Sequence, residues 1–318
     1  MVKKMRLFFP SWAGKSRWMP ILCAFLLFPV AVFPQNVDFI ADWHKGDVYR
    51  FNVKKTIQKD KQTVSIAYTL TMSVLDSTES GYRLRMRYDN VPFDLFGDSL
   101  ENLGIDLSLV DELYDIYYTT NAAGEMQGIE NADAIIATTK KLMASILEAT
   151  GEDLDEGFMG ILDGIYTEEY LMTNVYKEIS LLHGPLGYSY PIKKPIVAKI
   201  KMENPISGGN FNAKTVTSVE EYDPETQFCR LHLQTLYDNA QLKKAVKQLF
   251  KAFKGLVGQD ELKEGLKNSY MTLVQDDVFE FKAYPGIPLK VESRRGTSIK
   301  IGSDESVKHE CFVIELAQ

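Results

Sequence analysis

QTVSIAYTLTMSV, residues 62–74, alternates apolar with small side chains over its whole length. One side of this alternation carries six apolar residues, namely Val64, Ile66, Tyr68, Leu70, Met72 and Val74. The other side carries only Thr, Ser and Ala. Successive side chains of a β-strand point to opposite faces, so a period of two predicts a long strand with one buried and one polar face. A sheet built on this strand is expected to be half buried, as antiparallel sheets commonly are.

The segments on either side of residues 62–74 carry the same period. Residues 46–57 (GDVYRFNVKKTI) precede it and residues 82–88 (YRLRMRY) follow it, with short polar turns between them. Strands joined by short turns pair antiparallel, so these three segments predict a meander. A further hairpin is expected around residues 121–124 (NAAG), where Asn and Gly favour a turn.

Strand patterns return in the second half of the chain. The expected strands are residues 196–202, 210–222, 226–237, 270–284, 288–301 and 306–317. Helices are expected after the candidate N-cap Asn131, at residues 166–176 and at residues 239–257. This order predicts an α+β fold with a large curved antiparallel β-sheet, a half-barrel-like meander with two or more helices packed on one face. No linker interrupts the pattern, so residues 36–318 are expected to form a single α+β domain.

The first 35 residues differ in composition from the rest. They contain five basic residues and no acidic one, and residues 18–33 (WMPILCAFLLFPVAVF) carry no charge. A basic segment followed by a short apolar run is typical of a signal peptide. The run is shorter than the ~20 residues of a spanning helix, so cleavage near Gln35 is favoured over an uncleaved anchor. We therefore expect a secreted chain, periplasmic or envelope-associated, without a stable transmembrane span after cleavage.

The charge balance excludes one class of partner. Residues 36–318 hold 31 of the 36 basic residues and all 43 acidic ones, which gives a net charge of −12. A nucleic-acid-binding protein needs a basic excess, so no nucleic-acid partner is expected. The helix expected at residues 239–257 is locally basic and amphipathic. It can lie on a membrane surface or pack its apolar stripe on the sheet, and the overall negative charge favours packing on the sheet.

Two cysteines follow residue 35, and both stand in strand-like segments. They are Cys229 and Cys311. In an oxidising compartment they can form a disulfide that closes a loop of about 80 residues. Two buried free thiols are the other interpretation, and the sequence leaves both open.

The sequence contains no signature of catalysis. The four histidines, at positions 44, 183, 232 and 309, stand in no zinc-binding spacing, and the acidic run at residues 152–157 fails the spacing of an EF-hand loop. Neither G-x-S-x-G, nor a P-loop, nor G-x-G-x-x-G occurs. We therefore expect a protein that is not an enzyme, with no cofactor and no metal.

Three arginines alternate with apolar residues in the strand expected at residues 82–88. They are Arg83, Arg85 and Arg87, and the period of two places their side chains on one face of the sheet. A guanidinium group presents a planar fork that suits carboxylates and phosphates, so this ladder is a candidate binding site for an anionic ligand. The alternative is a solvated face on which the arginines pair with acidic neighbours.

Several short segments give the chain a resemblance to known proteins. These are the opening strand GDVYRF (46–51), the hairpin TTNAAGEMQGIEN (119–131), the turn YDPET (222–226) and the closing strand PGIPLKVE (285–292). Together with the basic leader, they resemble uncharacterised secreted β-rich cell-envelope proteins and, more loosely, the periplasmic lipoprotein-carrier half-barrels. In those carriers a curved antiparallel sheet wraps helices and holds acyl chains. The resemblance implies an apolar or lipid-like ligand and transfers no functional residue.

The function expected from these patterns is that of a non-catalytic envelope protein that binds an apolar or lipid-like ligand in a curved sheet. The alternative is a structural or interaction module of a cell-surface complex, with an envelope protein as partner and no small-molecule ligand. An enclosed apolar cavity would favour the first, and an exposed apolar patch the second. A hydrolase is a third possibility, which a cleft with two titrating groups of shifted pKa would favour.

Overall fold

The computed structural model describes residues 36–92, 108–150, 167–168, 171, 175–203, 210–238, 240–242, 244, 270–301 and 304–317. The chain divides into two units, Met1–Gln35 and Asn36–Gln318, and all described residues belong to the second. The predicted signal peptide and the acidic run at residues 152–157 lie outside the described residues. So do nearly all of the helix predicted at residues 239–257 and most of the one predicted at residues 166–176.

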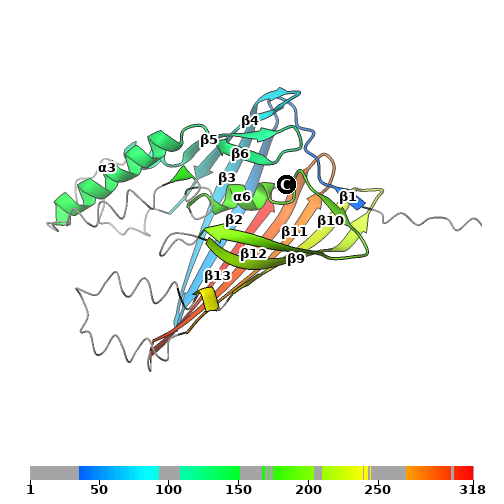
Figure 1. The fold of residues 1–318 in the computed structure, drawn as a ribbon. Coiled ribbons are helices and arrows are strands. Elements are labelled where there is room, and N and C mark those ends of the chain that lie inside the picture. Colours follow the sequence, from blue (N-terminus) through cyan, green and yellow to red (C-terminus); the bar gives the residue numbers. More distant parts are fainter. Residues whose placement is uncertain are drawn as a thin grey trace, which may run out of the picture. The chain divides into compact units, whose positions relative to one another are not determined.

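An 11-stranded antiparallel sheet dominates the described unit (Figure 1). Its strands are β2 (Val48–Lys59), β3 (Gln62–Thr78), β4 (Gly81–Asp89), β5 (Asp115–Asn121), β6 (Met126–Ile129), β8 (Ile196–Glu203), β9 (Asn210–Asp223), β10 (Phe228–Tyr237), β11 (Tyr270–Lys282), β12 (Ile287–Ile301) and β13 (Asp304–Leu316). Every segment with a period of two became a strand, because each has one side of apolar residues to bury. The predicted β-rich α+β class with a large antiparallel sheet is confirmed.

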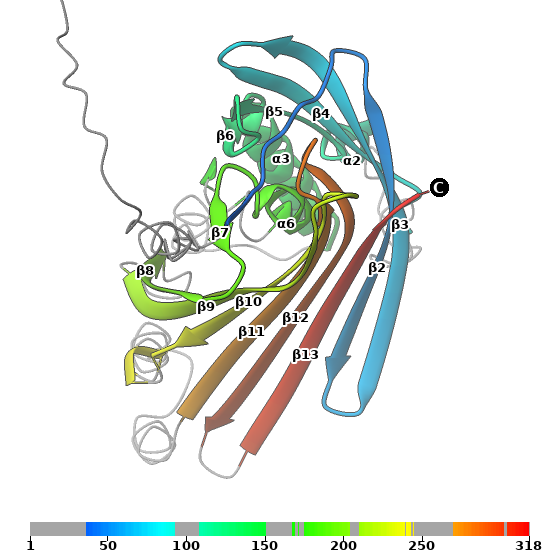
Figure 2. The ribbon, with the colours of Figure 1, turned by 90° about the vertical axis from the view of Figure 1, so that its right-hand side faces the viewer.

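The strand order across the sheet is β6-β5-β4-β3-β2-β13-β12-β11-β10-β9-β8. It consists of two meanders, one from each half of the chain, and Figure 2 shows β2 and β13 side by side where they meet. In that pairing Ile314 stands opposite Val53 and Phe312 opposite Lys55. The last strand of the chain therefore completes the sheet beside the first long one.

Helices and a small second sheet accompany the large sheet in the described residues. The helices are α2 (Ser108–Glu112), α3 (Ala132–Thr150) and α6 (Lys177–His183), and the second sheet pairs β1 (Asn36–Asp38) with β7 (Ser189–Pro191). The helix predicted after Asn131 is confirmed as α3. The sequence pattern did not predict α6, because seven residues are too few to show a helical period.

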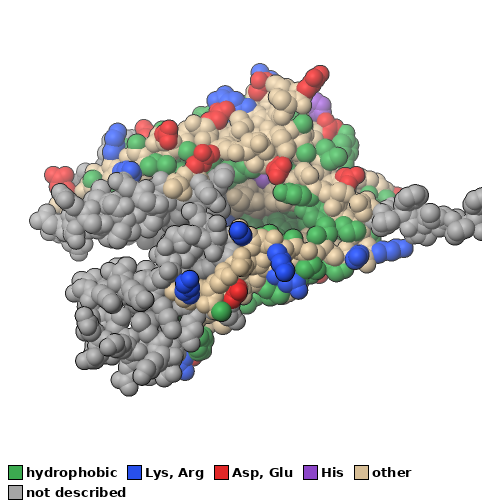
Figure 3. All heavy atoms as spheres, viewed as in Figure 1, with side chains coloured by type: hydrophobic (Ala, Val, Ile, Leu, Met, Phe, Trp, Pro, Cys, Tyr) green, Lys and Arg blue, Asp and Glu red, His purple; other side chains and the backbone are tan. Residues whose placement is uncertain are grey.

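The two faces of the sheet differ, as the alternation predicted. The face that contacts α6, which we call the inner face, carries the core side chains. They include Phe51, Leu70, Leu84, Tyr118, Phe279, Val291 and Ile314, all of them buried. Burial of one such side chain stabilises the fold by about 1.5–3 kcal/mol. Figure 3 shows hydrophobic side chains along the wall of a hollow in the described unit.

Polar side chains hold α6 to the inner face at both of its ends. Near its start, the Glu178 carboxylate accepts hydrogen bonds from the hydroxyls of Tyr68 and Tyr88. At its end, His183 Nδ1 lies 2.9 Å from the Gly124 carbonyl oxygen, and its Nε2 lies 3.0 Å from the Tyr118 hydroxyl. The carbonyl can only accept, so Nδ1 donates to it and the neutral ring accepts from Tyr118. Burial lowers the pKa of His183 to about 4.

The hairpin predicted at residues 121–124 joins β5 to β6. Asn121 Oδ1 accepts hydrogen bonds from the backbone N–H groups of Ala123 and Glu125, each at 3.0 Å. Gly124 has a φ of +90°, and a Cβ on it would lie 2.7 Å from the Ala41 Cβ. Both the positive φ and the lack of space for a Cβ require glycine at this position. The turn places the Gly124 carbonyl where His183 bonds to it.

Candidate functional site

The three arginines of the ladder lie on the outer face of β4, and each pairs with a carboxylate. The Arg83 Nε lies 2.8 Å from Glu130 Oε2, and the Arg87 Nε lies 3.2 Å from Asp89 Oδ1. Arg85 is bidentate: its Nε and Nη2 donate to the two oxygens of Asp115 at 2.6 and 2.8 Å. An anionic ligand would therefore have to displace a carboxylate at each step of the ladder.

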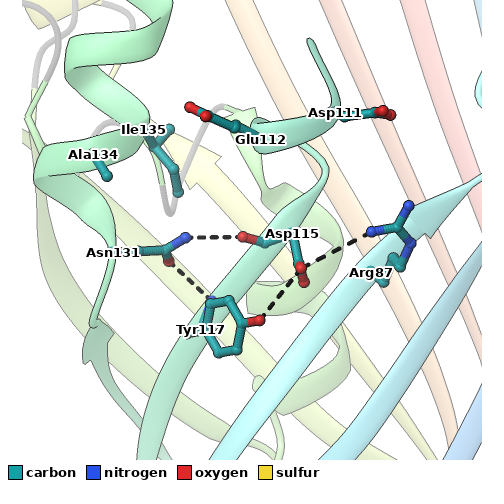
Figure 4. A pocket seen from close by; sticks show the side chains of 8 residues that line it. All are labelled: Arg87, Asp111, Glu112, Asp115, Tyr117, Asn131, Ala134 and Ile135. Carbon is teal, nitrogen blue, oxygen red and sulfur yellow. Dashed lines mark hydrogen bonds and ion pairs between the residues drawn. The ribbon is translucent and has the colours of Figure 1, made fainter. Parts of the chain in front are cut away.

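A pocket of about 450 Å³ adjoins the ladder where α2 and α3 meet β5 (Figure 4). Its polar wall contains the carboxylates of Asp111, Glu112 and Asp115 against the single guanidinium of Arg87. Asn131 also lines it, and its side chain bridges the β5 backbone by accepting from Tyr117 N and donating to Asp115 O. The net negative charge of this wall disfavours an anion. The side chain of Asn131, the candidate N-cap, thus bonds to the neighbouring strand.

The structure does not bring Cys229 and Cys311 together, so of the two interpretations that the sequence leaves open it favours free thiols over a disulfide. Both are free thiols. Cys229 lies on β10 and Cys311 on β13, with β11 and β12 between them. Three strand spacings of about 4.8 Å put them at least roughly 14 Å apart, whereas a disulfide needs Cα atoms within about 7 Å. The alternation also directs them to opposite faces, because Cys229 is in phase with the inner residue Leu231 and Cys311 is out of phase with the inner residue Phe312.

The inner face changes character along the strands of its central part. Next to α6 its side chains are apolar, and farther along β11, β12, β13 and β2 a charged stretch follows before apolar residues such as Ile57 and Leu273 return. We call this second region the inner charged cluster, and its members are Lys55, Lys177, Asp277, Arg295, Lys308 and Glu310. The register joins it into one patch: Arg295 stands opposite Glu310, and Phe312 stands between Lys55 on one strand and Ser293 on the other.

Two ammonium groups of the inner charged cluster share one aromatic ring. The Nζ of Lys55 lies 4.7 Å from the centroid of Phe312, and the Nζ of Lys177 lies 4.9 Å from it. The face of an aromatic ring attracts cations, which accounts for this position. The Lys177 Nζ is buried and has no hydrogen-bond partner within the part of the chain that the structure describes. Burial lowers the pKa of Lys177, against the attraction of Asp277 and Glu310.

Glu310 is the carboxylate that the lysines of the cluster share. Its oxygens lie 3.3 Å from Lys55 Nζ and 3.8 Å from Lys308 Nζ. Burial alone would raise the pKa of Glu310, but these two lysines and Lys177 outweigh it and lower the pKa. Glu310 therefore stays ionised. A pocket of about 80 Å³ lies beside it, lined by Arg295, Thr297, Lys308 and Glu310.

Asp277 is the second carboxylate of the cluster and is almost fully buried. Its Oδ2 accepts a hydrogen bond of 2.8 Å from Gln275 Nε2, while its Oδ1 has no partner among the described residues. Burial is the largest cause of a raised pKa for Asp277. The buried Ser293 hydroxyl stands opposite Asp277 on β12, and hydrogen bonding from Ser293 and Gln275 works against this rise. An almost fully buried carboxylate of this kind is costly in a fold.

The sequence analysis missed every residue of the inner charged cluster. A usable signal existed for the five that lie on strands, because these charged residues stand in phase with buried apolar ones. Lys55 follows Phe51 and Val53 on the same side of β2, and Arg295 follows Val291 on the same side of β12. Nothing local marks Lys177 as part of this cluster, since it lies on α6.

The histidines do not form a site in the described residues. His232 lies on the outer face of β10, with Nδ1 3.4 Å from Glu220 and Nε2 in contact with Asp276. His183 is a buried part of the core, as described above, and His44 and His309 lie elsewhere. No group of three or more His, Cys, Asp or Glu side chains suited to a metal ion occurs in the described parts of the chain.

Within the described segments, no helix combines the length and the apolar character needed to cross a bilayer. No family model matches the chain, and no curated protein is similar to it.

Proposed function

We propose that the chain is an exported, non-catalytic binding protein of the cell envelope that holds an apolar or lipid-like ligand against the inner face of its sheet. In this proposal the sheet is curved like a half-barrel and helices pack on its inner face, as in the lipoprotein carriers that the sequence resembles. The basic leader and the short apolar run that follows it support export.

The observation that carries the proposal is that apolar side chains of the inner face are exposed beyond the region that α6 contacts. Val64 of β3 is in phase with the buried Leu70 and Ile66, yet it is 48% exposed. Ile57, its partner on β2, is half-buried on the same face. Apolar side chains that continue a core into a solvent-accessible region are suited to contact with an apolar ligand.

Displacement of an uncharged fluorescent probe tests this function. The purified protein is titrated with 1-aminoanthracene, and 1-dodecanol is then added as a competitor. We expect Val64→Glu to weaken the affinity for 1-dodecanol by about tenfold or more, because a carboxylate would be placed against an alkyl chain. The matched control is Val274→Glu on the outer face, where Val274 is 46% exposed. Failure of the wild-type protein to bind 1-aminoanthracene and any twelve-carbon competitor would refute the function.

A specific observation favours a second candidate, the interaction module without a ligand. Val274 stands opposite Leu236 on the outer face, and both are exposed. If this pair is part of a docking surface for an envelope protein, Val274→Glu should release the protein from the envelope fraction and Val64→Glu should not. The same two variants therefore separate the two functions.

A further inference from the structure

We infer that the inner charged cluster binds the acidic head group, a carboxylate or a phosphate, of an amphipathic ligand whose chain lies on the apolar part of the inner face. This inference rests on the proposed function and specifies the chemical class of its ligand.

The first argument is the charge balance of the cluster. Four cations, Lys55, Lys177, Arg295 and Lys308, face two carboxylates. Glu310 is ionised, while burial favours the neutral forms of both Asp277 and Lys177. Lys55, Arg295 and Lys308 then stand against the one carboxylate of Glu310, so the cluster holds an excess of positive charge beside the apolar part of the inner face. An anion would supply the missing counter-charge.

The second argument is that two of the cations are unused by the protein. Lys177 Nζ is buried and has no hydrogen-bond partner in the described residues. Arg295 forms no hydrogen bond or ion pair within those residues, although it lines the pocket of about 80 Å³ beside Glu310. Guanidinium and ammonium groups make strong, charge-assisted hydrogen bonds to carboxylates and phosphates.

The third argument is the position of the cluster relative to the apolar residues. On the inner face of β12, Arg295, Ser293 and Val291 follow one another at every second residue, and Val291 belongs to the core. Lys55 likewise follows Val53 and is followed by Ile57 on β2. A head group at Arg295 would leave an attached alkyl chain in contact with the inner face. The small pocket has room for a head group and not for a whole ligand. The charged part of the face would therefore contact the head group, and the apolar part would contact the alkyl chain.

The experiment compares three ligands with the same alkyl chain by displacement of 1-aminoanthracene at pH 8. They are 1-dodecanol, dodecanoate and dodecyl phosphate. We expect the wild-type protein to bind at least one of the two anions roughly tenfold more tightly than 1-dodecanol. Preference for dodecanoate or for dodecyl phosphate identifies which acid the cluster takes.

Substitutions then show which residues cause the preference for an anion over the alcohol. Arg295→Gln and Lys177→Met should each lower the ratio of anion to alcohol affinity several-fold and leave the affinity for 1-dodecanol unchanged. The matched control is Arg294→Gln, because Arg294 is the next residue of β12, points to the outer face and pairs there with Glu292. Equal affinity of the wild-type protein for all three ligands would overturn the inference and leave the proposed function standing. If none of the three binds, the proposed function itself fails.

Discussion

Arg294 and Arg295 are consecutive residues of β12 that lie on opposite faces of the sheet and have opposite electrostatic surroundings. Arg294 is on the outer face, 69% exposed, and pairs with Glu292 two residues earlier on the same strand. Arg295 is on the inner face, half-buried, and has no ion pair in the described residues. A single step along the strand thus separates a solvated, paired surface charge from a half-buried charge without an ion pair in the described residues.

The arginine ladder of β4 resembles Arg294, since it also lies on the outer face and is paired. Each of its guanidinium groups is paired with a carboxylate on the outer face, where ion pairs contribute little to stability. The ladder is a regular surface feature of an antiparallel sheet. The inner face is different, because the Lys177 Nζ and Asp277 are buried there and Arg295 has no ion pair among the described residues.

Replacement of Lys177 by methionine is expected to stabilise the ligand-free protein. Methionine fills the same space on Phe312 without the desolvation penalty of a buried ammonium group, which has no hydrogen-bond partner in the described residues to offset it. The measurement is urea denaturation at pH 8, with Lys54→Met as control, since Lys54 is exposed on the outer face of β2. A loss of stability in Lys177→Met would mean that Lys177 serves the fold through Asp277 and Glu310.

The stability of the protein is expected to fall when the pH is lowered from about 6.5 to about 4. An unfolded histidine takes up a proton near pH 6.5, whereas the buried His183 has its pKa lowered to about 4. Between these values the unfolded state binds more protons, so acid favours unfolding. The contribution that His183 makes above pH 6.5, up to about 3 kcal/mol, is lost progressively over this interval.

Two variants test the assignment to His183. Urea denaturation across pH 4–7 should show a shallower pH dependence for His183→Gln than for the wild-type protein. Tyr118→Phe removes the hydroxyl that bonds to the imidazole but leaves the ring buried, so it should lower stability by about 1 kcal/mol and keep the pH dependence. An unchanged slope in His183→Gln would place the titrating group elsewhere.

The sequence predicted the local structure well and the cluster not at all, and the reason is the range of the interactions. The alternation in residues 62–74 depends on the strand alone, so β3 could be predicted from it. The pairing of Ile314 with Val53 joins the two ends of the chain, and no local pattern encodes it. Arg295, Lys55 and Lys177 become neighbours only through that pairing and through α6. The one local signal for the cluster was a charged residue on the same side of a strand as the buried apolar residues.

A double-mutant cycle is expected to show that Glu178 and the two tyrosines act together. Tyr68→Phe and Tyr88→Phe should each cost about 1–2 kcal/mol, since each removes a hydroxyl that donates to a buried carboxylate. In a Glu178→Gln background the charge is gone, so the cost of either tyrosine change should shrink by at least half. Strict additivity would show that the hydroxyls serve packing and not the carboxylate.

The two strand cysteines are expected to remain reduced in the native protein and to differ in accessibility. Cys229 is buried on the inner face, and burial raises the pKa of its thiol to about 12, so almost no thiolate is present at pH 8. Cys311 is only partly buried. Peptide mapping after alkylation of the native protein at pH 8 should therefore find label on Cys311 before Cys229, and labelling of both in denaturant without a reductant. Recovery of a Cys229–Cys311 cross-linked peptide would require β10 and β13 to be neighbours, which contradicts the strand order of the sheet.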